Sequence, residues 1–216
     1  MTTVSPKRIT SVADTTDTTG ANTGANAARA NARAVTRLLR SMRAVGRFSD
    51  RPVPYDVLID ILNTARWTGS SKNTQPWEVV VVRERATLEA LSQLGQFAGH
   101  LAGAQAALIL VMDSASNAFD CGRLAQSAML SAWAHGVGSC IGSLFPEEYS
   151  ARAKDLLGIP LEKWVRQTIS LGYPDGPEAL RVSSTPRTAT VLPSLGRKPL
   201  DRFASWERYG QRSRSK

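Results

Sequence analysis

The sequence of 216 residues lacks long apolar runs. None reaches the roughly 20 residues that a membrane-spanning helix needs, and the amino terminus has no apolar signal segment. We therefore expect no membrane partner and a cytoplasmic location. Cysteine and histidine are also scarce. Cys121 and Cys140 form no CxxC pair, which favours reduced core thiols, and with His100 and His135 as the only imidazoles we expect no metal centre.

The body of the chain has no excess of either positive or negative charge, although the net charge of the whole chain is +9. Residues 1–47 carry eight Lys or Arg against two Asp, and residues 208–216 carry four basic residues and no acidic one. The part between them is close to neutral. The basic ends lack interleaved aromatic residues, zinc-finger spacing and a helix-turn-helix pattern. We therefore expect solvated extensions and no nucleic-acid partner.

The usual motifs of hydrolytic and phosphoryl-transfer enzymes are absent as well. There is no GxxxxGK[ST], no GxSxG and no acid-rich cluster suited to a metal. The segment GVGSCIG, residues 136–142, has GxGxxxG spacing and follows an expected helix. A dinucleotide-binding turn instead follows a strand and opens a helix, so we reject a Rossmann site.

Apolar periodicity in the rest of the chain predicts a three-layered α/β or α+β domain around a small sheet. The helix expected at 119–135 is apolar almost all round, which predicts that protein encloses it. Residues 1–28 are too poor in large apolar groups to order, and an Arg-rich helical stretch follows them. We expect a flexible basic extension at 1–35, one domain at 36–210 and a basic tail at 211–216. Further helices are expected at 54–67, 88–94 and 146–157, and strands at 79–82, 108–112 and 168–171.

A polar loop directly before an expected buried strand is the most unusual feature that is present. Residues 70–82 read SSKNTQPWEVVVV. The chain has no evident catalytic acid, base or nucleophile, but amide, hydroxyl and glycine-backbone groups recur on this loop and on 136–142. Such a combination is expected where a cofactor carries the chemistry and the protein orients it. The alternative is that Asn73 and Gln75 only satisfy a turn.

Five segments in order resemble the nitroreductase family of FMN-dependent oxidoreductases. They cover residues 43 to about 209 and read RAVGRFSDRPVP with LIDILNTARW, SSKNTQPWEVVVVRE, DCGRLAQSAMLSAWAHGVGSCIGSL, LLGIPLEKWVRQTISLGYP and RKPLDRFASWERYG. The resemblance implies an α+β, three-layer α/β/α fold with a mixed, mainly antiparallel sheet of four to five strands flanked by helices. It also implies a homodimer with FMN at its interface and a domain-swapped carboxy-terminal arm, here residues 193–210.

The resemblance implies the cofactor site position by position. Residues of the loop that begins at Ser70 would contact the isoalloxazine ring and the ribityl chain. The turn after the central helix would lie near the ring from the partner subunit, and basic residues at both ends of the domain would hold the phosphate. The implied cofactor-binding residues are Arg43, Ala44, Ser70, Ser71, Asn73, Gln75, Cys140, Ile141, Gly142, Arg197 and Lys198.

The sequence departs from the family in the phosphate-binding box. Where the family has Arg-Arg-Ser-x-Arg, this chain aligns MRAVG, residues 42–46, so two of three arginines and the serine hydroxyl are missing. Arg40 or Arg47 would be candidates to compensate, although Arg47 lies one place from the expected position. Gly69 and Lys72 also replace what are commonly a proline and a small residue.

The activity that the resemblance implies needs no catalytic side chain, because the chemistry occurs at N5 of FMN. NADH or NADPH would reduce the flavin and leave, and a small-molecule acceptor such as a nitroaromatic or a quinone would then be reduced, in a ping-pong cycle. Three alternatives stay open: a deazaflavin as donor, a flavin as substrate, or a non-catalytic homologue that has lost FMN.

Overall fold

The computed structural model describes residues 18–180 and 199–212. Arg197 and Lys198 lie outside these ranges, as do residues 1–17 and 213–216. The chain divides into two compact units, Met1–Met42 and Arg43–Lys216, and each is described by itself.

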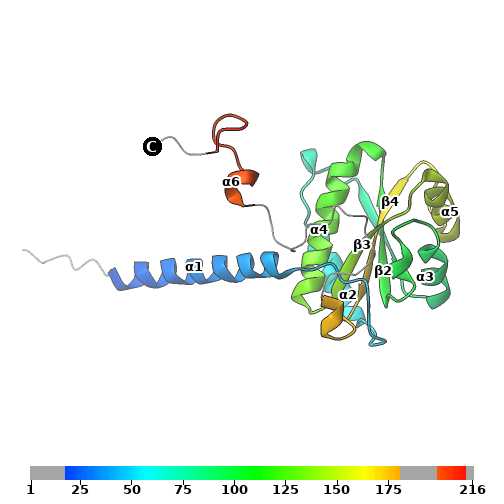
Figure 1. Ribbon diagram of the computed structural model, residues 1–216, viewed down its shortest axis with the longest axis horizontal. Coiled ribbons are helices and arrows are strands. Elements are labelled where there is room, and N and C mark those ends of the chain that lie inside the picture. The colour runs from blue at the N-terminus through cyan, green and yellow to red at the C-terminus, as the bar shows by residue number, and fades with distance from the viewer. Residues whose placement is uncertain (1–17, 181–198, 213–216) are drawn as a thin grey trace, which may run out of the picture. The chain divides into compact units, whose positions relative to one another are not determined.

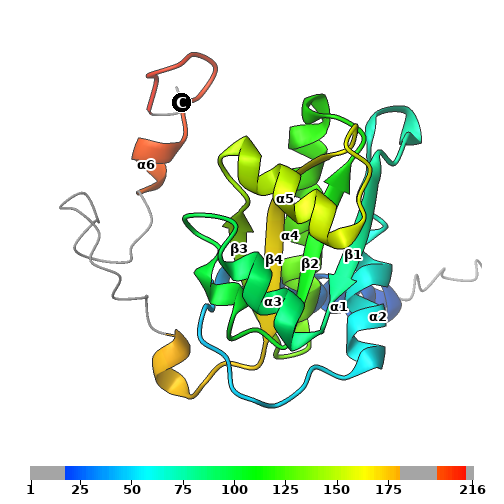
Figure 2. The same ribbon diagram turned by 90° about the vertical axis from the view of Figure 1, so that its right-hand side faces the viewer.

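The second unit is built on one four-stranded sheet (Figure 1), and Figure 2 shows its strand order β1-β2-β4-β3. The strands are β1 Trp77–Val82, β2 Ala106–Met112, β3 Gly138–Ser143 and β4 Trp164–Gly172. All three neighbouring pairs are antiparallel. One isolated parallel bridge joins Ala44 to Ser139 at the β3 edge, so the expected mixed, mainly antiparallel sheet is confirmed.

Helices cover both faces of this sheet, as Figure 2 shows with α3 and α5 in front of the strands and α4 behind them. The expected three layers are therefore confirmed, and the α+β class is that of the family fold. The helices of these layers are α2 Tyr55–Ala65, α3 Arg85–Ser92, α4 Ala118–Ala134 and α5 Glu147–Leu157.

The core forms around β2, whose seven residues AALILVM are all buried. A continuous apolar run of this kind is typical of a strand covered on both faces. On the face of α3, Leu88 and Leu91 pack with Ile109 and Val111 of β2 and Val165 of β4. The leucine spacing that predicts a helix at 88–94 therefore identifies its buried side correctly, although α3 already ends at Ser92.

Residues 138–143 form a strand, and the expectation of a turn at Cys140, Ile141 and Gly142 is wrong. Glycine, serine and cysteine have little intrinsic preference for strands, and pairing along the whole of β4 decides the conformation. The glycine that opens the strand has a packing role. A Cβ on Gly138 would lie 2.8 Å from Val45 Cβ.

Helix α4 leaves one face exposed in the single chain, so the expectation that protein encloses it requires a partner copy and stays a prediction. Its exposed residues Phe119, Arg123 and Gln126 recur every three to four positions. Its other face buries Leu124 and Ala128, among others, and packs against α2.

The described part of the first unit, residues 18–42, contains one helix, α1 Thr18–Ser41, which lies largely within the segment that composition predicts to be flexible. Its arginines recur at helical spacing, and Val35 and Leu39 are exposed apolar side chains. No helix among the described residues is both long enough and apolar enough to cross a bilayer. The carboxy-terminal piece has a short helix, α6 Leu200–Phe203, and its crossing to a partner subunit stays a prediction.

Candidate cofactor site

The polar loop, residues 70–75, has a strained and well-anchored backbone. Lys72, Asn73 and Gln75 have φ values of 51°, 55° and 49°. Non-glycine residues rarely adopt such values, and three so close together persist only where the surroundings fix them. The hydroxyl Oγ of Ser70 accepts a hydrogen bond from the Gln75 N–H at 2.9 Å, and the Trp77 N–H donates to the Gln75 carbonyl at 2.8 Å. The loop is therefore preformed.

The side chains of Asn73 and Gln75 project from this loop into solvent. Neither amide has a hydrogen-bond partner among the described residues, so the expectation that they merely satisfy the turn fails at the side-chain level. The hydroxyl of Ser70 performs that task instead. Ser71 is exposed at the start of the short 3₁₀ turn Ser71–Asn73. The loop thus presents two amides, each with donor and acceptor groups, to a ligand.

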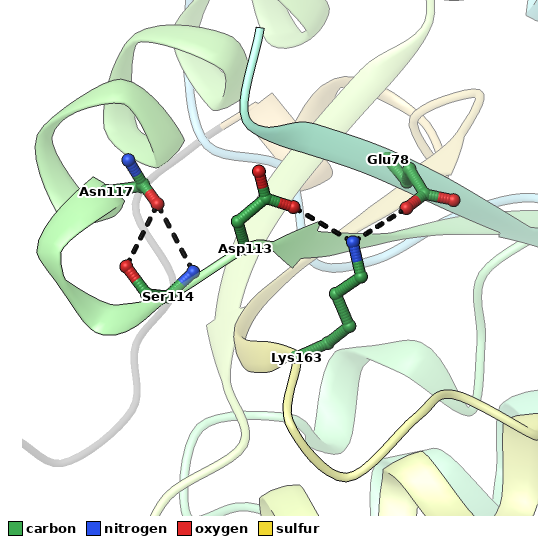
Figure 3. A network of polar contacts seen from close by, with 5 residues as sticks. All are labelled: Glu78, Asp113, Ser114, Asn117 and Lys163. Carbon is green, nitrogen blue, oxygen red and sulfur yellow. Dashed lines mark hydrogen bonds and ion pairs between the residues drawn. The ribbon is translucent and has the colours of Figure 1, made fainter. Parts of the chain in front are cut away.

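A polar network fixes the end of the sheet from which the loop emerges (Figure 3). The Lys163 Nζ donates to Glu78 Oε1 at 3.0 Å and to Asp113 Oδ1 at 2.9 Å, which connects the ends of β1, β2 and β4. The hydrogen bonds with Asp113 and Glu78 raise the pKa of Lys163. The Asn117 Oδ1 accepts from the N–H of Ser114 at 3.2 Å, which caps the turn that leads into α4.

The second group of expected site residues lies on β3 at the opposite edge of the sheet. The Val45 N–H donates to the Ser139 carbonyl at 2.8 Å, so the backbone groups of residue 139 face the free edge. Backbone groups alternate along a strand, and those of Ile141 therefore face the same edge. The Ile141 side chain is 45% exposed. This edge offers a backbone N–H beside an apolar surface.

Several buried polar atoms near β3 have no hydrogen-bond partner within residues 18–180 and 199–212. They include Ser139 Oγ and Gln167 Oε1. Gln167 pairs with Ser143, two positions from Ile141, so both side chains share the face of Ile141. Unpartnered buried acceptors cost free energy, and such atoms are expected beside a site that a polar ligand completes. Among the described residues, no group of three or more metal-ligating side chains is placed to hold an ion.

His100 packs against the opposite face of β3. Its Nε2 lies 3.1 Å from the point that a Cβ on Gly142 would occupy, so only glycine fits there without displacement. Neither ring nitrogen makes a hydrogen bond of good geometry. Burial lowers the pKa of His100, although the nearby backbone of Ile141 and Phe97 opposes the shift. The imidazole is therefore neutral at physiological pH.

One chain does not bring the two groups of residues together. The polar loop precedes β1, while Cys140, Ile141 and Gly142 lie on β3, and two strands separate these edges. At about 4.8 Å per strand, β1 and β3 are about 14 Å apart. Arg43 and Ala44 lie beside β3, with Ala44 bridged to Ser139. The expected site residues thus fall into two separate groups, which we call candidate half-sites: the polar loop, and the β3 edge with residues 43–44.

The basic residues expected to compensate for the altered box are only partly available. Arg47 pairs with Asp175 at 3.4 Å, so its charge is partly neutralised by a carboxylate. Arg40 belongs to the first unit, and a role for it in phosphate binding stays a prediction. Phosphate binding by Arg43, Arg197 and Lys198 stays a prediction.

Comparison with known proteins supplies the decisive observation. The family profile described as Nitroreductase family matches residues 39–115 and 100–173. The chain belongs to the nitroreductase family. A provisionally named NADH dehydrogenase/NAD(P)H nitroreductase of Archaeoglobus fulgidus is 31% identical over 146 residues, which are 64% of this chain and 84% of that one. The expectation of an oxidoreductase enzyme of this family is therefore confirmed.

Relatives of this nitroreductase-family chain include two of particular use. A chloronitrobenzene nitroreductase of Comamonas testosteroni is 45% identical over 58 residues, 25% of this chain and 26% of that one. The solved structure of an FMN-dependent nitroreductase from Clostridium difficile has a TM-score of 0.60 at 27% identity, and the match covers 64% of this chain and 86% of that one.

A second solved structure extends the fold comparison. A provisionally assigned nitroreductase of Desulfovibrio desulfuricans, solved in complex with FMN, has a TM-score of 0.66 over 81% of this chain and 97% of that one. At 19% identity this likeness shows the fold alone.

Sequence reasoning missed one charged residue beside the polar loop. The Nη2 of Arg123, on α4, lies 3.0 Å from the point that a Cβ on Gly69 would occupy. Two features of the sequence could have indicated this residue: it is an arginine in a helix otherwise poor in charge, and a glycine stands at position 69, where the family commonly has proline. Neither observation places the two residues in contact without the packing of α4 on the loop.

Proposed function

We propose that this nitroreductase-family chain is an FMN-dependent enzyme that passes electrons from NADH or NADPH to an electron-poor small molecule, such as a nitroaromatic or a quinone, in a ping-pong cycle. Bound FMN would supply the redox chemistry between the nicotinamide and the acceptor, and the residues of the polar loop and of β3 would hold it. The observation that carries the proposal is the strained polar loop, which holds two exposed, unpaired amides in a fixed backbone. The FMN dependence named for the Clostridium difficile protein supports it.

The residues of the chain fit a flavin. Its pyrimidine edge has alternating donors and acceptors, which the amides of Asn73 and Gln75 can match. On the other half-site, the outward N–H of Ile141 suits an acceptor atom of the ring. Because Gly142 has no Cβ, the strand can pack closely against His100. Rigid placement of these groups orients the ring and excludes water from one side of it.

The two half-sites lead us to propose that a homodimer completes the site. In a two-fold symmetric pair, the polar loop of one copy faces the β3 edge of its partner, and the same contact occurs twice. The exposed face of α4 adjoins the segment just before the polar loop, because Thr68 Oγ1 donates a hydrogen bond to Ser127 Oγ at 3.0 Å, so this face would lie at the same interface. The arm at 193–210 would cross onto the partner.

The phosphate would be held by Arg43, Arg197 and Lys198, because a dianion requires forked or point-charge donors. Ala44 and residues 42 and 46 supply no side-chain donor, so we expect weaker FMN binding than a complete box would give. Residues 36–210 would be the folding unit that binds FMN. Both cysteines are free thiols, which suits a reducing cytoplasm.

The test is the visible spectrum of the purified full-length protein, followed by heat release and identification of any flavin. We expect a yellow protein with about one FMN per chain, bleached anaerobically by NADH or NADPH. Asn73→Ala with Gln75→Ala should weaken FMN binding, whereas Gln93→Ala, which removes an amide at the carboxy-terminal cap of α3, should not. A colourless protein that neither retains nor is stabilised by added FMN would contradict the proposal and favour a non-catalytic homologue.

The dimer and the cycle have separate tests. Light scattering after size-exclusion chromatography should give the mass of two chains. Initial-rate plots for NADH at several acceptor concentrations should give the parallel lines of a ping-pong cycle. Intersecting lines would require donor and acceptor to bind together and would reject this part of the proposal. If the protein is reduced only by a reduced deazaflavin, then the deazaflavin is the donor in place of the nicotinamide.

A further inference from the structure

A turn between α3 and β2 packs directly against β3. It comprises residues 95–101 and ends in a short 3₁₀ turn, and we call it the supporting turn. Ala98 and Leu101 anchor it in the core on the α3 side of the sheet. A Cβ on Gly95 would overlap the carbonyl oxygen of Ser143, the last residue of β3. The position of the turn is therefore coupled to that of the strand.

His100, in the supporting turn, lies between the two parts of the β3 half-site. A Cβ on Gly46 would lie 3.5 Å from the Cβ of His100, and a Cβ on Gly142 would lie 3.1 Å from its Nε2. One end of the side chain therefore faces the segment that follows Arg43 and Ala44, and the other end faces the strand. Because both neighbours are glycines, the imidazole packs closely against the backbone of each.

The imidazole is packed there without a polar partner. Neither Nδ1 nor Nε2 makes a hydrogen bond within residues 18–180 and 199–212, and both atoms are shielded from solvent. A charge on such a ring would lose its hydration and gain no hydrogen bond of good geometry. Burial accordingly lowers the pKa of His100, and the backbone of Ile141 and Phe97 offsets only part of this effect. The close packing of the ring thus depends on its neutral form.

The charged groups around His100 do not favour an imidazolium either. The elements packed against the supporting turn are α3, β3, β4 and residues 43–47. Their titratable side chains are Arg43, Arg47, Arg85, Glu89, Cys140 and Arg166. Four of these are cations and one is a carboxylate, and none of them forms a hydrogen bond with the imidazole. The surrounding charge therefore opposes a further positive charge on the ring.

We propose that His100 is a positioning residue of the candidate cofactor site: its neutral ring holds residues 43–46 and β3 together, and its protonation separates them and weakens FMN binding. The proposal rests on the proposed function and concerns the regulation of the same site. A charged ring reaches water only when the turn and the strand move apart. The Ile141 N–H and the Arg43 side chain, both assigned to FMN above, then lose their relative placement. His100 acts through these neighbours and needs no contact with the flavin.

The primary test measures the dissociation constant of FMN from the full-length protein at pH 8.0 and pH 5.5, by quenching of flavin fluorescence. The form that binds FMN takes up fewer protons, so acid favours the form that does not bind it. One proton with the ordinary pKa of 6.5 would weaken binding by about tenfold at pH 5.5, and a lowered pKa reduces this limit. We therefore expect a loss of about twofold to tenfold that depends on His100. His100→Gln, which is neutral at both pH values, should bind FMN as wild type does at pH 8.0 and lack this loss.

Two controls separate His100 from other groups that titrate. The phosphate of FMN itself loses its second proton near about pH 6, so each variant is compared with wild type at the same pH. The ratio of the two dissociation constants cancels the contribution of the cofactor. His135→Gln is the matched variant, because His135 is the only other histidine and caps α4. It should keep the full acid dependence. Far-ultraviolet circular dichroism at each pH restricts the comparison to folded protein.

The titration of the ring itself provides an independent measurement. Nuclear magnetic resonance of protein with ¹³C-labelled histidine follows the His100 signal, which is assigned by its absence from His100→Gln. FMN should lower the pH at which this signal titrates, because the cofactor binds the form with the neutral ring. By linkage, the shift between free and bound protein must account for the pH dependence of FMN affinity. Equal midpoints with and without FMN would contradict the proposal, whereas a purely structural role of His100 predicts such equality.

The outcomes separate this inference from the function on which it rests. If FMN binds more tightly in acid and His100→Gln abolishes this gain, His100 is a cationic contact of the cofactor and the positioning role is wrong. If affinity falls equally in wild type and His100→Gln, the positioning role is also wrong. In both cases FMN still binds and the proposed function stands. A protein that binds no FMN at either pH overturns both.

Discussion

The contact between Gly138 and Val45 gives a prediction whose size follows from the structure. In Gly138→Ala the new Cβ would lie 2.8 Å from Val45 Cβ, 2.9 Å from Cγ1 and 3.0 Å from Cγ2. Carbon atoms in contact prefer about 3.5–4.0 Å, so all three atoms must move. Val45 is completely buried and branched at Cβ, which restricts its rotamers, and a change of rotamer would not move its Cβ.

Overpacking of this kind costs about 1–3 kcal/mol, and the alanine recovers about 0.4–1 kcal/mol because it restricts the unfolded chain. We therefore expect Gly138→Ala to lower the free energy of unfolding by about 1–2 kcal/mol. Gly103→Ala is the matched control, since nothing lies within 4 Å of its Cβ position. It should leave stability unchanged or slightly raised.

The assay is urea denaturation followed by tryptophan fluorescence, extended to a double-mutant cycle. Val45→Ala removes two methyl groups and should cost about 1.6 kcal/mol by itself. Combined with Gly138→Ala it removes two of the three close contacts, those with Cγ1 and Cγ2, and leaves the one with Cβ. The double variant should therefore be more stable than the sum predicts by about 1 kcal/mol. Additivity within about 0.5 kcal/mol would refute the reasoning. Because Val45 joins Ser139, Gly138→Ala should also weaken FMN binding more than Gly103→Ala does.

Three further predictions concern the network and the buried side chains. Lys163→Met, which removes the donor to Glu78 and Asp113, should speed amide hydrogen exchange at the start of β1, and Lys163→Arg should restore protection. Unchanged exchange in Lys163→Met would contradict a stabilising role of the network. The pKa of His100 is lowered from its ordinary value of 6.5, so the native state binds fewer protons than the unfolded state and the free energy of unfolding should fall below about pH 6.5. His100→Gln should flatten this dependence between pH 7.5 and 5.5, and an equal slope would contradict it. Burial raises the pKa of Cys121 to about 11, so a thiol reagent at pH 8 should label the half-buried Cys140 first, by mass spectrometry.

The site could be read from the sequence only where its signal is local. The polar loop combines strand-initiating Pro-Trp with amides that a turn does not require, and the structure places both amides in solvent on a fixed backbone. The β3 half-site was found only through the family resemblance, and its conformation was expected to be a turn. The segment contains two glycines, two serines and one cysteine among six residues, so local preference alone does not predict a strand there.

The sequence by itself determined the buried strand β2 and the helix α2, because a continuous apolar run and the spacing of Leu58, Ile61 and Ala65 depend only on neighbours along the chain. It also determined the family, since the motifs recur in order. Only the tertiary structure decided that β3 pairs with β4, that the half-sites lie on opposite edges of one sheet, and that Arg123 reaches Gly69. Each of these depends on contacts between segments far apart in sequence, whose energies come from packing and not from local preference.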